Sequence, residues 1–69
     1  MPLTMAKTGE TLTIRRITGR DDVRAHLAEL GFVVDGAVKV VSELAGNLIV
    51  QVKDSRIALD RSMANRIMV

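Results

Sequence analysis

The segment HLAELGFVVDG, residues 26–36, joins a helical pattern to a turn and decides how the chain folds. Val23, Leu27 and Leu30 recur at i, i+4 and i+7, which predicts one apolar stripe on an amphipathic helix. A helix that closes in the left-handed conformation favours glycine there, because that conformation costs other residues about 1 to 2 kcal/mol. Gly31 is therefore predicted to end the helix and to aim the chain that follows it.

Residues on either side of the stripe predict how this helix begins and where the chain goes afterwards. Asp21 is expected to be the N-cap, and the carboxylate of Asp22 suits the positive end of the helix dipole. The apolar residues 32–34 are expected to fold over the helix end or the sheet rim. The Asp-Gly pair at 35–36 then predicts a tight turn that starts the next strand.

The rest of the chain mostly has the period of β-strands. Alternating or apolar segments predict five short strands, at 11–17, 37–41, 47–53, 56–59 and 67–69. In the first segment Ile17 breaks the alternation of apolar and polar residues, which indicates a bulge or the end of the strand. Five strands with one helix inserted after the first predict a mostly β fold, a small closed SH3-like barrel, because closure removes exposed strand edges.

Short helical turns are expected near both ends of the chain, and tight turns between the strands. Thr4 is predicted to cap one helical turn that Gly9 ends, and Asp60 to cap another near the C-terminus. Residues 45–47 predict a hairpin loop, and residues 54–55 predict a second tight turn.

Length and composition narrow the class of protein. The chain has 69 residues, no cysteine and one aromatic residue, and 48% of it is apolar. This length predicts a single domain, residues 1–69, with no room for a large substrate cavity. No apolar run approaches the ~18 residues of a membrane span, and the N-terminal residues do not resemble a signal peptide. We therefore expect a cytoplasmic protein with no direct membrane insertion, and its net charge of +2 predicts only a mild basic balance.

Catalytic and metal-binding patterns are weak. The chain has one histidine, His26, which lies off the apolar stripe and is expected to be a solvated or rim residue, with a weak metal ligand as the alternative. No nucleophile stands beside an oriented base, and no glycine-rich phosphate loop is present. The sequence predicts no catalytic residues, no cofactor and no enzyme activity. Nucleic-acid binding is also disfavoured, because single-strand platforms stack bases on aromatic side chains.

Several stretches in their order resemble the FeoA family. They are LAELGF, then Gly36 with AVKVV, and then ELAGNLIVQVKDSRIALDRSMANRIMV, so the similarity covers nearly the whole chain. The resemblance implies an SH3-like barrel that acts as a small cytosolic accessory protein of bacterial ferrous iron uptake. Its implied partner is FeoB, a membrane iron transporter with a cytosolic GTPase domain, which would recruit it to the inner face of the membrane.

Residues that match the family motif are expected to hold the fold, and the residues that they position form the candidate contact surface. The set expected to hold the fold is Leu27, Leu30, Gly31, Gly36, Ala58, Leu59 and Ala64. The candidate partner-binding set consists of apolar residues at the helix exit and cations near them in sequence or motif: Arg20, Arg24, His26, Phe32, Val33, Val34, Arg56 and Arg61. Within this set Phe32 has an alternative role, which is to staple the helix to the sheet.

The predicted function is that of a non-enzymatic adaptor that supports ferrous iron transport by docking on its transporter. Whether docking modulates GTP hydrolysis is left open by the sequence. The alternative is a carrier or sensor that binds ferrous iron directly, although the ligand spacing gives this little support. The oligomeric state is left open by the sequence.

Overall fold

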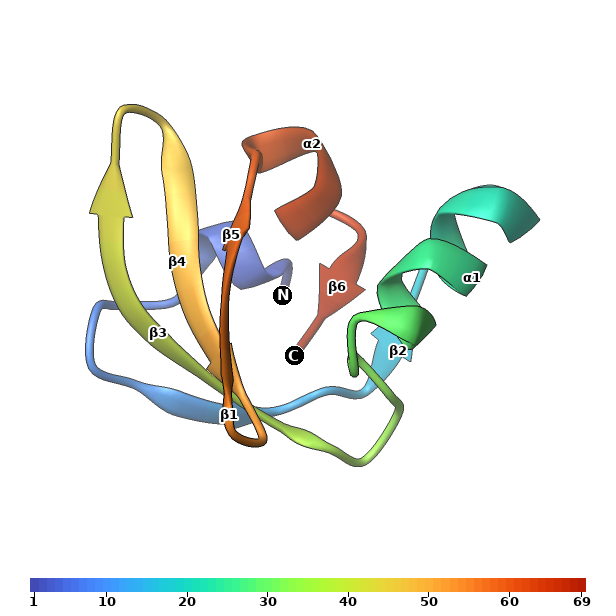
Figure 1. Ribbon diagram of the computed structural model, residues 1–69, viewed down its shortest axis with the longest axis horizontal. Helices are drawn as coiled ribbons and strands as arrows, with labels where there is room; N and C mark the ends of the chain where they lie inside the picture. The colour runs from blue at the N-terminus through green and yellow to red at the C-terminus, as the bar shows by residue number, and fades with distance from the viewer.

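The computed structural model describes residues 1–69 and is mostly β, with two short α-helices and one 3-10 helix. Its elements in chain order are η1 (Leu3–Met5), β1 (Thr11–Thr13), β2 (Arg16–Ile17), α1 (Asp21–Glu29), β3 (Ala37–Leu44), β4 (Asn47–Val52), β5 (Ser55–Leu59), α2 (Arg61–Ala64) and β6 (Ile67–Met68). In Figure 1 the long strands lie on one side of the molecule, α1 projects from the other, and the two termini lie close together between them. The short helical turns expected near both ends are confirmed.

The strands form two separate sheets, so the expected closed five-stranded barrel is wrong. One sheet has the order β1-β3-β4-β5, and the other contains only β2 and β6. The first predicted strand divides because its backbone changes partner: the Ile14 N–H donates to Gly36 O, whereas the Arg15 N–H donates to Met68 O. Consequently α1 follows the second strand instead of the first.

The predicted alternation of the strands places their apolar side chains in one core. Val38 and Val40 of β3 are buried, and the opposite side chain on β4, Val50, is fully buried as well. The complete set of buried residues is Leu3, Ile14, Leu27, Phe32, Val38, Val40, Leu48, Val50, Val52, Leu59, Ala64 and Ile67. All of them are hydrophobic, so the core contains no buried polar side chain.

Two tight turns connect β3, β4 and β5. The predicted hairpin is confirmed, but its loop is only Ala45–Gly46, because Asn47 already pairs with Leu44. Both loop residues have positive φ angles, 53° and 82°, as a type I′ turn requires. The second turn lies at Lys53–Asp54, one residue earlier than predicted, because Val52 pairs with Ser55 across it. A register shift between Val40 and Ser42 adds a bulge to β3.

Caps were predicted correctly at one helix and wrongly at two. Asp60 caps α2, since its Oδ1 accepts the Met63 N–H at 2.8 Å. The N-cap of α1 is Arg20, one residue before Asp21, and it makes no side-chain cap. The hydroxyl of Thr4 donates to the side-chain oxygen of Asn65 at 2.6 Å and caps no helix.

Gly9 does not end the first helical turn, because η1 ends at Met5 and the Gly9 N–H donates to Val40 O. This bond and the one from the Val40 N–H to Glu10 O extend the pairing of β1 with β3. No helix of the structure combines the length and the apolar character needed to cross a bilayer.

Candidate functional site

The exit of α1 is closed by two backbone hydrogen bonds. The Gly31 N–H donates to Ala28 O and the Phe32 N–H donates to Leu27 O, each at 3.0 Å. With Gly31 at φ 105°, this is the glycine-closed helix end that the sequence predicts. The side chains of Leu27 and Phe32 are both fully buried, as expected where a hydrophobic contact accompanies this motif.

The burial of Phe32 changes its expected role. Its side chain has no exposed surface, so the expectation that it presents a partner-binding anchor is wrong. The alternative, a staple between helix and sheet, agrees with its place in the core cluster beside residues of α1, β3 and β4. The sequence could not separate the two roles because Phe32, Val33 and Val34 are consecutive apolar residues with no period among them.

The next four residues, Val33–Gly36, form a tight turn that we call the helix-exit turn. The Gly36 N–H donates to Val33 O at 3.0 Å, Asp35 has a φ of 71°, and its N–H donates to Ile14 O at 2.7 Å. A Cβ at Gly36 would lie 3.0 Å from Val33 O, so glycine fits there best. This turn exposes 42% of Val33 and 54% of Val34.

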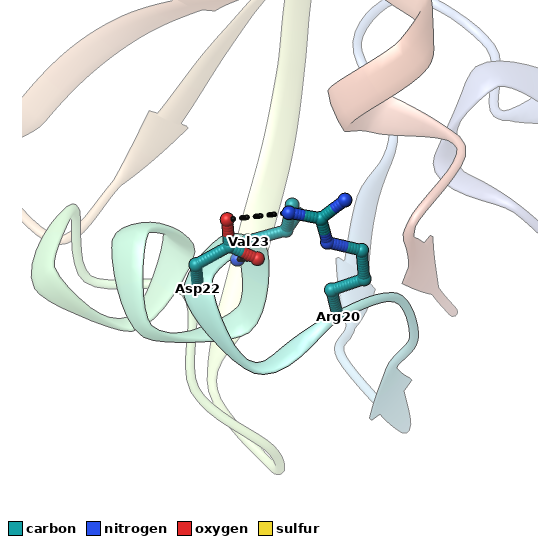
Figure 2. A network of polar contacts seen from close by, with 3 residues as sticks. All are labelled: Arg20, Asp22 and Val23. Carbon is teal, nitrogen blue, oxygen red and sulfur yellow. Dashed lines mark hydrogen bonds and ion pairs between the residues drawn. The ribbon is translucent and has the colours of Figure 1, made fainter.

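The cations of α1 pair with carboxylates of the same helix. Arg24 approaches Asp21 at 2.6 Å, and Arg20 approaches Asp22 at 3.3 Å. Figure 2 shows Arg20 reaching back to Asp22, whose second oxygen accepts the Val23 N–H at 2.9 Å. All four charged side chains are more than half exposed, so these pairs are solvated and contribute little to stability.

The remaining candidates lie on other elements. His26 is exposed on α1, and no group of three histidine, cysteine or carboxylate side chains is placed to hold a metal ion. Arg56 lies on β5 beside Gln51, whereas Arg61 begins α2 at the far end of β5 and lies 3.8 Å from Glu43. The structure therefore brings Val33 and Val34 together but does not gather the eight predicted residues into one patch.

The residues expected to hold the fold do so with one exception. Leu27, Leu59 and Ala64 are buried, and Leu30 is partly buried against the core. Ala58 is exposed, because it pairs with Ile49 on the outer side of the sheet. Its expected place in the core is wrong.

The outer face of the four-stranded sheet, opposite the core, contains a depression that the sequence did not predict. One cross-strand row runs from Thr11 through Lys39 and Gln51 to Arg56. An open depression of about 340 Å³ lies on this face, lined by Thr11, Ala37, Val38, Lys39, Gln51 and Lys53. The alternation of the strands marks residues 11, 39, 51 and 56 as polar positions. Only the register of the strands shows that these positions form one row.

The chain matches known proteins over its whole length. A family model described as the FeoA domain matches residues 1–69. The Fe(2+) transport protein A of Methanocaldococcus jannaschii is 32% identical over 68 residues, which are 99% of this chain and 83% of that protein.

Two solved structures share the fold. The FeoA of Stenotrophomonas maltophilia, described as a prokaryotic SH3 domain protein in complex with zinc, is 28% identical with a TM-score of 0.86, covering 99% of this chain and 87% of its own. A second crystal structure, described as the iron uptake regulatory protein FeoA, is 26% identical with a TM-score of 0.86, covering 96% of this chain and 88% of its own.

Proposed function

The chain belongs to the FeoA domain family, which is associated with ferrous iron transport, and we propose that it is a non-enzymatic accessory protein that docks on the cytosolic part of a FeoB-type transporter. Such docking places the chain at the inner face of the membrane, beside the transporter's GTPase domain. Modulation of GTP hydrolysis then follows from contact with that domain.

One structural observation supports docking most strongly, and it is the exposed apolar pair of the helix-exit turn. Val33 and Val34 are 42% and 54% exposed, although the core directly beside them buries Phe32 completely. Two backbone bonds close the turn, from the Gly36 N–H to Val33 O and from the Asp35 N–H to Ile14 O, so the pair is held in place before any partner binds. Exposed apolar residues on a preorganised turn are typical of a contact point in a protein interface.

The test compares two pairs of exposed apolar residues. Val33→Ser with Val34→Ser should weaken binding to the full-length transporter in nanodiscs by about tenfold or more, because interface energy concentrates in a few apolar anchors. The matched control is Met5→Ser with Leu44→Ser, since these side chains are 68% and 70% exposed and lie on other elements.

Binding is measured by interferometry against empty nanodiscs, and circular dichroism melts verify that both variants are folded. A transporter that never binds the parent chain would refute the docking function. Anaerobic titration with ferrous iron distinguishes the carrier alternative, because a carrier must bind the ion tightly without the transporter.

A further inference from the structure

The outer face of the four-stranded sheet presents cations, and the one acidic residue of its strands, Glu43, pairs with the buried Leu48 on the core side. The registers Thr11↔Lys39, Lys39↔Gln51 and Gln51↔Arg56 place one row of side chains across all four strands. Neighbouring strands are about 4.8 Å apart, so the backbones at Lys39 and Arg56 are separated by about 10 Å. Lys53 follows Gln51 by two residues and lines the same depression as Lys39.

These three cations have no partner within the chain. The structure contains three ion pairs, of Arg20, Arg24 and Arg61, and none of them involves this face. Two carboxylates, Asp35 and Asp54, stand in turns at the end of the sheet nearest Lys53, and neither makes an ion pair within 4.0 Å. Unpaired charges on a fixed sheet steer and orient a partner of opposite sign.

The shape and composition of the face favour a protein segment over a nucleic acid. The depression is open and shallow, and small or polar side chains such as Thr11 and Ala37 surround it. Base stacking needs exposed aromatic side chains, and the single aromatic residue, Phe32, is fully buried. A carboxylate-bearing segment needs only the cations and the hydrogen-bonding groups of Thr11 and Gln51.

A second copy of the chain is a poor match for this face. The carboxylates at the start of α1 are already engaged, Asp21 with Arg24 at 2.6 Å and Asp22 with Arg20 at 3.3 Å. Glu43 lies 3.8 Å from Arg61. Asp35 and Asp54 make no ion pair, but no three carboxylates of the chain come together, so a second copy offers no concentrated acidic surface for the basic face.

The face adjoins the helix-exit turn. A Cβ at Gly31 would lie 3.3 Å from the buried side chain of Val52, so the end of α1 packs on the core side of the strand that leads to Lys53. Val34 is three residues before Ala37, which lines the depression, so their Cα atoms are at most about 11 Å apart. The apolar pair therefore lies at the end of the sheet, close to the lining of the depression.

We propose that the face carrying Lys39, Lys53 and Arg56 binds an acidic segment of the transporter's cytosolic part, an inference that rests on the docking function proposed above. The cations orient the partner by charge, and the apolar pair of the neighbouring turn anchors it. This arrangement has the organisation of a protein interface, in which apolar anchors lie beside a polar rim.

The experiment compares two triple variants with the same change in charge. Lys39→Gln, Lys53→Gln and Arg56→Gln together should weaken binding to the full-length transporter in nanodiscs by about tenfold or more, and should flatten the salt dependence of binding. The matched control is Lys7→Gln with Arg15→Gln and Arg16→Gln, which removes three exposed, unpaired cations elsewhere and should change the affinity by less than about twofold.

A second measurement uses a 12-residue polyglutamate peptide on the 15N-labelled parent chain. We expect amide shifts along the row from Thr11 to Arg56 and at Lys53, with little change in α1. A 12-nucleotide oligothymidylate is titrated beside it, and we expect it to bind more weakly than polyglutamate.

Each outcome decides one proposal. If the transporter binds the parent and the first triple variant equally, the basic face is wrong and the docking function stands. If the transporter binds neither the parent nor the triple variant, the docking function is wrong. Polyglutamate shifts on the row would then still support an acidic ligand. Shifts elsewhere, or no shifts, would overturn the acidic ligand. Tighter binding of the oligothymidylate would overturn the protein ligand in favour of a nucleic acid.

Discussion

The helix α1 and the outer face of the four-stranded sheet both present arginine or lysine. The cations of the helix are paired with carboxylates, whereas those of the sheet face are unpaired. At the helix, Arg20 and Arg24 are paired with carboxylates two and three residues away, within one turn. On the sheet, Lys39 and Arg56 lie in a row whose other members are Thr11 and Gln51. Helical spacing brings opposite charges of one segment together, whereas a sheet row collects residues from distant parts of the chain.

The difference teaches that exposed charge alone does not identify a binding surface. The cations of α1 are compensated locally, and the same segment supplies the glycine and the aromatic residue that fix the helix end. The cations of the sheet are uncompensated and contribute nothing visible to the fold. We therefore assign a mainly structural role to α1 and its closure, and a binding role to the sheet face with the helix-exit turn.

The largest loss of stability is expected from Phe32→Ala, which tests the structural role of the helix exit. Removing a fully buried aromatic side chain that packs in the core should lower the free energy of unfolding by about 3 to 5 kcal/mol. Urea denaturation measures this directly. Val34→Ala is the control, because Val34 is 54% exposed and its truncation should change stability by about 0.5 kcal/mol or less. Equal losses in the two variants would show that the helix exit is not stapled through Phe32.

Gly31→Ala should give the next effect, a loss of about 1 to 2 kcal/mol, because its φ of 105° disfavours any side chain. A Cβ there would also lie 3.3 Å from the Val52 side chain. Gly46→Ala is the matched control, with a φ of 82° and no atom within 4 Å of its Cβ. Thermal melts should show a smaller loss of stability for Gly46→Ala than for Gly31→Ala. A larger loss for Gly46→Ala would show that crowding against Val52 adds nothing to the cost at Gly31.

The sequence predicted the helix and its closure because both depend on neighbours along the chain. The stripe of Val23, Leu27 and Leu30 and the glycine after it specify a helix end wherever the segment lies. The hairpin at Ala45–Gly46 was predictable for the same reason. Local patterns of this kind survive in the folded molecule because tertiary packing agrees with them.

The rest depended on distant partners. The division of the first strand at Ile14 and Arg15 follows from bonds to Gly36 and Met68, which no local pattern indicates. The Phe32 side chain was ambiguous for the same reason. The basic face is a product of register, since residues 11, 39, 51 and 56 become neighbours only when four strands align. Single-residue alternation predicts that each points outward but not that they share a row.

The smallest effect on stability is expected from Arg24→Gln. It removes an ion pair in which Asp21 is 96% exposed, so the free energy of unfolding should change by less than about 1 kcal/mol. Melts at low and high salt measure the difference, and the parent and the variant should converge as salt screens the pair. A loss that grows with salt would mean that Arg24 acts through packing instead of charge.

The most direct test of the account is the affinity of the full-length transporter for two variants that each lose two positive charges. Lys39→Gln with Arg56→Gln removes the uncompensated cations of the sheet, and Arg20→Gln with Arg24→Gln removes the compensated cations of the helix. We predict that the sheet variant binds about tenfold more weakly than the parent and that the helix variant stays within about twofold. A helix variant that loses more affinity than the sheet variant, with both chains folded, would contradict the account.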